Sequence, residues 1–392
     1  MMKIIQISSA SSSFSAEDYE EDIFRVWSSK VGFELKRFYP SLEIECWAIE
    51  KKYKNERKLE RNKIKFRIFP TDFSLRHGME ISLFLIKALK KEIDRAKKEN
   101  KKLIIHIHEY HTWLAYSILK SIKKDKNIKI IAQHHGGRSP FKNLRKYNRF
   151  FLIFPLVALM QLCERILLKK IEVFYALSNE EIKYLKEISP QSKIKFQTMG
   201  ISEEYFKKIG KKTAWKKLGL NLNKKYLLYI GRIKTTKGIK ELLDAAKILE
   251  KQDIKFLLIG NGTEKEVLEF ENYAKDKEIN NVKFLGAIYG KEKLYYLSAC
   301  DCLVLPSYTE GAPVVIMEAM AKNLPVIATD VGGVSIMIKN GKGGVIIKPK
   351  SANEIVEAIK EVFTWKRKDI KKNAKKYKWK KIIKDIAEDY LK

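Results

Sequence analysis

The stretch PSYTEGAPVVIMEAMAKNLPVIATD, residues Pro306–Asp330, decides the fold of this chain. It begins at the end of an apolar run, CLVLPS, and continues through a turn, a helical segment from Pro313 to Lys322 and a second apolar run, PVIATD. Strand, turn, helix and strand in this order is the repeating unit of a parallel α/β sheet. The stretch also holds two carboxylates, Glu310 and Glu318, among apolar and small residues, where an ionised group needs a partner or a ligand.

The same alternation extends through the whole chain. Parallel strands are buried on both faces, so they are expected as short apolar runs separated by amphipathic helices. Such runs occur at Lys3–Ser8, Glu43–Ile49, Ile64–Phe69, Leu103–His108, Ile128–Gln133 and Glu172–Ser178, and again at Tyr226–Gly231, Lys255–Gly260, Val282–Gly286, Cys302–Ser307, Pro325–Asp330 and Gly344–Pro349. The rhythm breaks over Ile194–Lys208, and 392 residues are long for one domain. We therefore predict an α/β protein with two doubly wound parallel-sheet domains facing a cleft.

The two glutamates have two interpretations. Ligands of doubly wound sheets bind beyond the carboxyl ends of the strands, and Glu310 lies in such a turn, with Glu318 on the following helix. Two carboxylates there could accept hydrogen bonds from the hydroxyl groups of a ribose or hexose, beside first-turn amides that attract anions. Alternatively, Glu310 caps the helix and Glu318 faces solvent.

A basic turn follows another apolar run. In GRIKTTKG, Arg232 and Lys237 flank a turn, and Gly238 lies at the entrance of a helix. A guanidinium and an ammonium near helix-terminal amides suit a diphosphate. The turn has neither the GxxxxGK[ST] nor the GxGxxG pattern of other phosphate-binding loops.

The amino-acid composition limits the possible binding partners of the protein only broadly. A formal net charge of +32 favours nucleic acid, anionic lipid or phosphate-bearing ligands, and it equally fits the lysine-rich composition of heat-stable or low-GC proteins. No recognised nucleic-acid-binding motif occurs, so we expect no nucleic acid as a partner. The four cysteines include no second pair that would complete a zinc site, and we expect buried free thiols in a reducing cytoplasm.

Taken together, these motifs resemble those of the retaining nucleotide-sugar glycosyltransferases of family 4, the glycosyl transferases group 1, which have the GT-B fold. The E-x7-E signature of that family stands here as Glu310–Glu318, within EGAP, EAMA, PVIA and GG segments. The other matching elements are Gly231-Arg232, Lys237-Gly238, Gly260-Asn261-Gly262 and the set Val282, Phe284 and Gly286. The resemblance covers Leu227–Pro349.

The resemblance implies roles for the donor side. Arg232 and Lys237 would hold the donor diphosphate, Glu310 would face the transferred sugar, and Glu318 would bind the ribose. The backbone of Gly311, Ala312, Pro313 and Val314 would contact sugar hydroxyls, and Gly231, Gly262 and Gly286 would line the donor site. Members of the family retain anomeric configuration and use no metal, so we expect neither a metal nor another cofactor.

The acceptor side matches less closely. LIIHIHEYHTWLAY resembles a strand-to-helix turn of the family and places His108, Glu109 and His111 near the ligand. IIAQHHGG assigns His135 to the position beside the sugar, and FYALSNEE adds Ser178. In place of the glycine loop of the family, residues 9–13 have the serine-rich sequence SASSS, whose amides would contact ligand less closely.

The resemblance also implies the domain boundaries. Residues 1–200 would form the acceptor-side domain, residues 201–364 the donor domain, and a helix within residues 365–392 would cross back to the first domain. Lys97–Arg149 is rich in basic residues and precedes the apolar run Phe150–Cys163. That run packs in the core or docks on an anionic membrane surface, so a cytoplasmic protein and one attached to the inner membrane face both stay open.

The sequence thus predicts a retaining hexosyltransferase. It would transfer sugar from a UDP- or GDP-linked donor to a saccharide or lipid-linked saccharide in polysaccharide or glycan synthesis. The alternatives are a GT-B nucleotide-sugar epimerase, and a non-catalytic protein that binds nucleotide sugar or nucleic acid.

Overall fold

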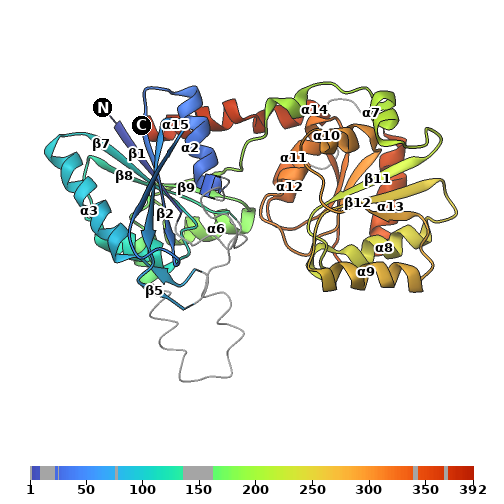
Figure 1. The fold of residues 1–392 in the computed structure, drawn as a ribbon, viewed down its shortest axis with the longest axis horizontal. Helices are drawn as coiled ribbons and strands as arrows, with labels where there is room; N and C mark the ends of the chain where they lie inside the picture. Colours follow the sequence, from blue (N-terminus) through green and yellow to red (C-terminus); the bar gives the residue numbers. More distant parts are fainter. Residues whose placement is uncertain are drawn as a thin grey trace, which may run out of the picture. The chain divides into compact units, whose positions relative to one another are not determined.

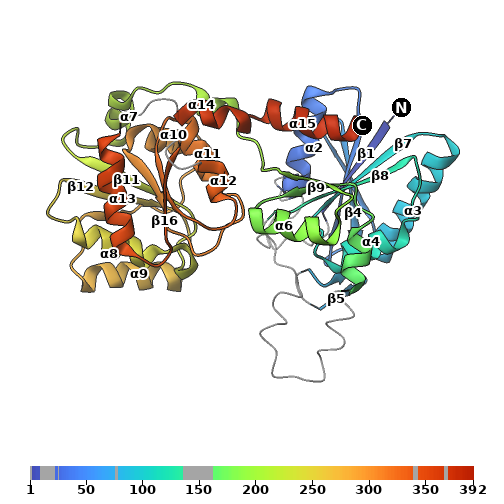
Figure 2. The same ribbon diagram turned by 180° about the vertical axis from the view of Figure 1, so that it is seen from behind.

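The computed structural model of this chain describes residues 2–8, 23–24, 26–75, 78–135, 162–338, 343–365 and 370–392. They form two compact units, drawn in Figure 1 and from behind in Figure 2. The first unit comprises Met1–Met199 and Lys380–Lys392, and the second comprises Gly200–Trp379. Each unit has its own sheet with helices packed on it, as the alternation of apolar and amphipathic stretches predicts.

The first unit is built on an eight-stranded sheet in the order β10-β9-β8-β7-β1-β2-β4-β3. The strands are β1 (Met2–Ser8), β2 (Glu43–Glu50), β3 (Arg57–Arg61), β4 (Ile64–Pro70), β7 (Lys102–His108), β8 (Ile128–Gln133), β9 (Val173–Ala176) and β10 (Lys193–Phe196). Neighbouring strands are parallel, except that β3 pairs antiparallel with β4. The short strands β5 (Phe73–Ser74) and β6 (Glu80–Ile81) pair separately. The six predicted strands are confirmed, and β3 and β10 are additional.

The core of the first unit lies along the central strands. Ile5 and Ile7 on β1 and Ile105 and Ile107 on β7 are fully buried, and each such side chain contributes about 1.5–3 kcal/mol on burial. The helices of this unit include α2 (Trp27–Phe38), α3 (Leu83–Lys98), α4 (Trp113–Ser121), α6 (Asn179–Ile188) and α15 (Trp379–Leu391).

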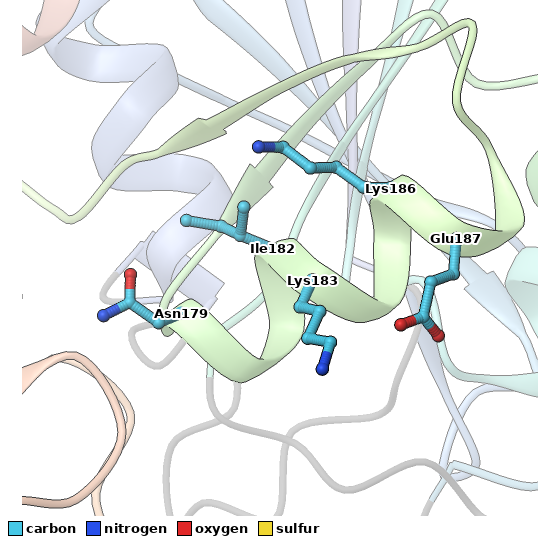
Figure 3. A pocket seen from close by; sticks show the side chains of 5 residues that line it. All are labelled: Asn179, Ile182, Lys183, Lys186 and Glu187. Atoms are coloured by element: carbon cyan, nitrogen blue, oxygen red, sulfur yellow. The ribbon is translucent and has the colours of Figure 1, made fainter.

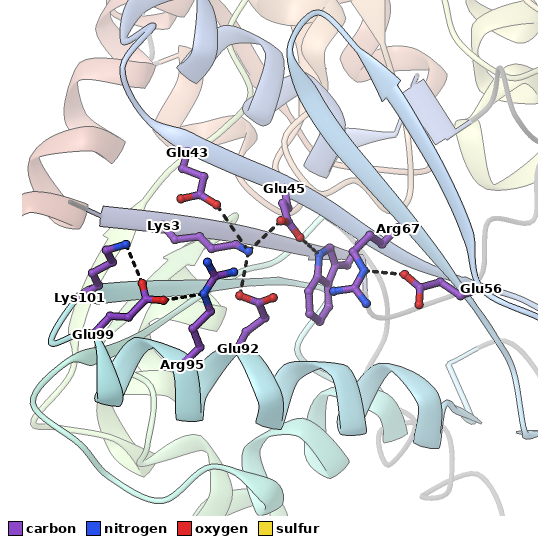
Figure 4. Close-up of polar contacts among 10 residues, drawn as sticks. Lys3, Glu43, Glu45, Glu56, Arg67, Glu92, Arg95, Glu99 and Lys101 are labelled. Atoms are coloured by element: carbon purple, nitrogen blue, oxygen red, sulfur yellow. Dashed lines mark hydrogen bonds and ion pairs between the residues drawn. The ribbon is translucent and has the colours of Figure 1, made fainter.

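A cluster of ion pairs fixes the amino end of β1 (Figure 4). The Nζ of Lys3 lies 2.8 Å from Glu45 on β2 and 2.8 Å from Glu92 on α3. Burial opposes the charge of Lys3, but hydrogen bonds to the two carboxylates prevail and raise its pKa. Glu45 also accepts a hydrogen bond of 2.8 Å from the Trp47 indole. Because this cluster lies at the amino end of the strand, its role is to join β1, β2 and α3.

The second unit is built on a six-stranded parallel sheet in the order β13-β12-β11-β14-β15-β16. Its strands are β11 (Lys225–Ile230), β12 (Ile254–Ile259), β13 (Val282–Phe284), β14 (Cys302–Leu305), β15 (Val326–Thr329) and β16 (Gly344–Ile347). Its helices are α7 (Lys211–Leu218), α8 (Ile239–Ile248), α9 (Glu264–Asp276), α10 (Gly290–Ala299), α11 (Val314–Ala321), α12 (Val334–Ile338), α13 (Ala352–Thr364) and α14 (Ile370–Ala374), with 3₁₀ turns η2 (Glu203–Phe206), η3 (Thr235–Lys237) and η4 (Lys375–Tyr377). All six strands predicted for this half are confirmed.

The last helix returns to the first sheet. The buried carboxylate of Asp389 on α15 lies 2.7 Å from the Nζ of Lys193 and 2.5 Å from the Nζ of Lys195, and it accepts a hydrogen bond of 3.0 Å from the Tyr175 hydroxyl. These contacts attach α15 to β9 and β10. The returning helix is α15, which lies within residues 365–392, whereas α14 packs against α11 in the second unit.

The cysteines differ in burial. Cys46, Cys300 and Cys302 are buried free thiols, as expected, whereas Cys163 is exposed. The expectation of a buried thiol is therefore wrong for Cys163.

Candidate functional site

Each sheet has a point where its strand order reverses. In the second sheet β11 lies between β12 and β14, and in the first sheet β1 lies between β2 and β7. Ligands of open parallel sheets bind beyond the carboxyl ends of the strands at such a point. The loops after β11, β12, β13 and β14, together with α11, carry the predicted donor residues. The carboxyl ends of β7 and β8 carry or precede His108 and His135. One of these groups of residues lies in each unit.

The second sheet brings Lys237 and Glu310 into direct contact. The Nζ of Lys237 lies 2.6 Å from the Oε1 of Glu310, and the Ser307 hydroxyl donates to the same oxygen at 2.7 Å. The two side chains are only 17% and 12% exposed. Lys237 ends η3, directly after β11, and Glu310 lies in the turn after β14. The adjacent strands therefore bring together a cation and a carboxylate that are 73 residues apart in the chain.

Glycines allow these loops to approach each other. Gly238 has a φ of +67°, and a Cβ there would lie 2.1 Å from the carbonyl oxygen of Pro306, at the end of the neighbouring strand. Gly332 has a φ of +60°, and its Cβ would lie 2.3 Å from the carbonyl oxygen of Glu310. The Gly333 amide donates to the Gly311 carbonyl at 2.7 Å. The backbone around Lys237 and Glu310 is thus held by close contacts that a larger residue would prevent.

Glu318 lies on α11 and is buried, 6% exposed. Its Oε2 lies 2.6 Å from the Nζ of Lys293 on α10. Burial and then the charge of Glu318 raise the pKa of the Tyr205 hydroxyl, which lies beside it. The helix has Pro313 at its N-cap and no side-chain cap, so the interpretation of Glu310 as a cap and Glu318 as a solvated residue is wrong. Sequence reasoning missed Lys293 and Tyr205, because neither belongs to a motif.

The other predicted donor residues lie in loops of the same unit. Arg232 is exposed, and the structure gives its guanidinium no hydrogen bond or ion pair within the described ranges. In the first turn of α11 the Ile316 amide donates to the Pro313 carbonyl at 3.1 Å, and no side chain caps the helix. A Cβ on Gly262 would lie 2.2 Å from the Ile233 carbonyl oxygen, so this glycine lets two loops pack. Gly286 has a φ of +69° and open space around it, and Gly231 donates its amide to Ile259.

The first sheet brings His108 and His135 together. His108 is the last residue of β7, and its Nδ1 lies 2.7 Å from the Nε2 of His135, which follows β8. The His135 ring stacks on Trp27, with ring centroids 5.5 Å apart, and its amide donates to the Glu109 carboxylate at 2.7 Å. Glu109 has a φ of +66°. Burial first, and then neighbouring histidines, hold the pKa of His108 and of His135 well below the usual value.

Two other residues predicted on the acceptor side have structural partners. His111 is buried, and its Nδ1 lies 2.6 Å from the Glu164 carboxylate, which also accepts from Tyr116. Ser178 is the N-cap of α6, where its hydroxyl accepts the Glu181 amide at 3.1 Å. These contacts account for both residues within the fold, and contact with a ligand stays a prediction for them.

A shallow, open pocket lies on α6 (Figure 3), lined by Asn179, Ile182, Lys183, Lys186 and Glu187. One helix supplies all its side chains, and none belongs to the groups above. Within the described ranges no cluster of three or more His, Cys, Asp or Glu side chains could hold a metal ion. No helix of the described parts is long and apolar enough to cross a bilayer. The serines at 9–13 and most of the apolar run from Phe150 lie outside the described residues.

Comparison with solved structures shows which class of fold this is. The Anabaena protein HepE, solved with UDP, superposes with a TM-score of 0.70 over 100% of both chains at 18% sequence identity. A sequence identity this low supports a similarity of fold and nothing about function. The two parallel-sheet units therefore define a GT-B fold, as predicted.

Comparison of sequences finds a family match in the second unit. The profile of the glycosyl transferases group 1 family matches residues 210–377, which lie within that unit, so the chain resembles this family over less than half of its length. It is 34% identical over 183 residues to an uncharacterized glycosyltransferase of Methanocaldococcus jannaschii, covering 44% of this chain and 46% of the relative. It is 35% identical over 153 residues to the N,N'-diacetylbacillosaminyl-diphospho-undecaprenol alpha-1,3-N-acetylgalactosaminyltransferase of Campylobacter jejuni, covering 38% of each. The matched segments span less than half the length of these curated relatives.

Proposed function

We propose that this protein is a retaining glycosyltransferase that transfers a hexose-type sugar from a nucleoside diphosphate sugar to a saccharide or lipid-linked saccharide. The observation that carries the proposal is the contact of Lys237 with Glu310 at the point where the strand order of the second sheet reverses. An ammonium there binds phosphate oxygens, and a carboxylate accepts hydrogen bonds from hydroxyls. A sugar joined to a diphosphate is a ligand that uses both groups at once.

In the proposed reaction the bond between the anomeric carbon and the β-phosphate oxygen breaks. A bond forms from that carbon to an acceptor hydroxyl oxygen, whose proton passes to the departing phosphate. Negative charge grows on the diphosphate, and Lys237 and Arg232 stabilise it. Glu310 and the backbone from Gly311 to Val314 hold sugar hydroxyls, and Glu318 holds the ribose. The proposal assigns the charge stabilisation to these two cations and requires no metal.

The acceptor side of the proposal rests on the first unit. His135, with His108 beside it, lies at the carboxyl edge of that sheet, and we assign it to the transferred sugar or the acceptor hydroxyl. The name of the Campylobacter jejuni relative describes transfer to a sugar on a lipid diphosphate. That relationship supports a saccharide or lipid-linked acceptor in glycan assembly as the class to test first.

The experiment is thermal unfolding with UDP, GDP, ADP and their sugars, without metal. A ligand at a hundred times its Kd stabilises the native state by about 2.7 kcal/mol, which raises Tm by roughly 5–10 °C for a unit of this size. We expect one base to give the shift, Lys237→Ala and Arg232→Ala to abolish it, and Glu318→Ala to reduce it. Lys251→Ala, which removes an exposed lysine of the same unit, is the matched control.

The same variants separate binding from transfer. A shift for the parent protein, with sugar transfer to a saccharide acceptor, supports the proposal in full. A shift without transfer or hydrolysis of the donor would favour a non-catalytic nucleotide-sugar-binding protein. Equal shifts for the parent and Lys237→Ala would remove the assigned donor site.

A further inference from the structure

A chain of buried hydrogen bonds runs through the first unit to His135. The Nε2 of Gln6 on β1 donates to the Tyr390 hydroxyl on α15 at 2.8 Å, and the Gln6 Oε1 lies 2.7 Å from the Nε2 of His108. The Nδ1 of His108 lies 2.7 Å from the Nε2 of His135. Gln6 is fully buried, Tyr390 is 1% exposed and His108 is 3% exposed. Every distance is that of a good hydrogen bond.

This chain of hydrogen bonds has a direction, because an amide oxygen only accepts hydrogen bonds. The His108 Nε2 faces the Gln6 oxygen, so it must carry the hydrogen. A neutral His108 then has only a lone pair on Nδ1, and the Nε2 of His135 must donate to it. His135 is left with Nε2 protonated and Nδ1 as its acceptor.

The other end of the chain explains how Gln6 keeps this orientation. The Tyr390 hydroxyl lies 2.7 Å from the Nδ1 of His106. Because this hydroxyl accepts from Gln6, its own hydrogen is left to point at His106. His106 is fully buried, and its Nε2 has no hydrogen-bond partner among the described residues. That unpaired polar atom costs free energy, a cost that an apolar side chain in place of His106 would avoid.

We propose that Gln6 and Tyr390, acting through His108, are positioning residues that hold His135 as the neutral Nε2–H tautomer. Its Nδ1 is then available to accept a hydrogen bond. The ligand group that His135 recognises is therefore a donor, such as a sugar hydroxyl, and not a phosphate or carboxylate oxygen. That assignment of the ligand rests on the proposed function, but the tautomer does not.

The three imidazoles of this hydrogen-bond chain are neutral because they are buried. Burial, and then His135, lowers the pKa of His106 to about 3, and burial is also the main cause of the depressed pKa of His108 and His135. The Glu109 carboxylate accepts the His135 backbone amide, and Trp27 covers a face of the ring. All three imidazoles are therefore neutral at pH 7.

The test is nitrogen-15 NMR of histidine-labelled full-length protein at pH 7.5, where the two ring-nitrogen shifts identify each tautomer. The chain has six histidines, and His135→Gln assigns one signal by its loss. We expect a single Nε2–H form for His135 in the parent and in Gln6→Glu, whose carboxylate still accepts from His108. In Gln6→Leu and Tyr390→Phe we expect both the Nε2–H and the Nδ1–H tautomer of His135, because each variant removes a hydrogen bond that sets the direction of the others.

The control is Tyr116→Phe, which removes a hydroxyl bonded to Glu164 in the same unit and should leave the His135 signals unchanged. An Nδ1–H or cationic His135 in the parent would overturn the proposal, as would an unchanged His135 in both Gln6→Leu and Tyr390→Phe. If Gln6→Leu fails to fold, the parent, Gln6→Glu and Tyr390→Phe still decide. The NMR measurement needs no nucleotide, so it tests the tautomer of His135 even if the protein binds no nucleotide sugar. Failure of the proposed function would be seen in the thermal unfolding experiment instead.

Discussion

Replacing Glu310 by glutamine should tighten nucleoside diphosphate binding while it lowers sugar transfer. Without ligand, Lys237 is neutralised by Glu310 at 2.6 Å, with both side chains largely buried. A diphosphate must take the ammonium away from that carboxylate and then lie beside a like charge. The variant removes the competitor and the repulsion, and it keeps a carbonyl oxygen for the Ser307 hydroxyl.

The size of the effect follows from the contact. The bare Coulomb attraction at this separation is about 6 kcal/mol with an effective dielectric constant of 20. Desolvation of both ions cancels most of it, which leaves about 1.5 kcal/mol, above the 0.2–1 kcal/mol typical of exposed pairs. We therefore expect Glu310→Gln to lower the Kd about tenfold, since 1.4 kcal/mol is a factor of ten.

The assay is isothermal titration with the nucleoside diphosphate that stabilises the parent protein. A double-mutant cycle with Lys237→Met isolates the pair: Lys237→Met should weaken binding at least tenfold, and Glu310→Gln should give no gain in its presence. Glu269→Gln, an exposed glutamate of the same unit, controls for net charge. A weaker or unchanged Kd in Glu310→Gln would refute this account of the contact.

Two further predictions concern stability. Burial disfavours the charge of Asp389, but hydrogen bonds from Lys193 and Lys195 prevail and lower its pKa. The ionised Asp389 therefore stabilises the fold at pH values above its pKa in the unfolded chain. This stabilisation is lost as the pH falls through its pKa in the folded protein. Asp389→Asn should cost about 2 kcal/mol at pH 7 in urea unfolding, with the difference shrinking below about pH 4; a constant difference would contradict this. Gly238→Ala should cost more than 2 kcal/mol, because left-handed strain of about 1 kcal/mol adds to the collision with Pro306. Gly219→Ala, with a φ of +63° and nothing within 4 Å, should cost only about 1 kcal/mol, and equal losses would exclude the collision.

Strands buried on both faces could be read directly from the sequence. Continuous apolar runs such as those of β7 and β14 have no exposed face to interrupt them. The edge strand β3, RKLER, is mostly exposed, so it carries no apolar run or alternation that would reveal it. A returning helix could be expected within residues 365–392, but the basic stretch around α14 gives no sign in the sequence that this part packs on α11.

The candidate donor residues could be found because each follows a strand within a recognisable motif. The side chains that contact these residues could not be found from the sequence. Lys293 is one of many lysines in the sequence, and only the packing of α10 places it 2.6 Å from Glu318. The contact of Gln6 with Tyr390 spans 384 positions, and no local pattern predicts a pairing at that separation. Which nitrogen of His135 carries the hydrogen depends on just such a contact.

The placement of α15 has a consequence for synthesis on the ribosome. The sheet of the first unit is encoded before residue 200, but Asp389 and Tyr390, which bind its buried polar groups, follow the entire second unit. At about 5–20 residues per second the ribosome needs roughly 10–40 s to make those intervening residues. Throughout that interval the nascent first unit exposes the surface that α15 will cover. A chaperone that acts during this interval is therefore expected to bind the first unit, the half of the chain that is made earlier.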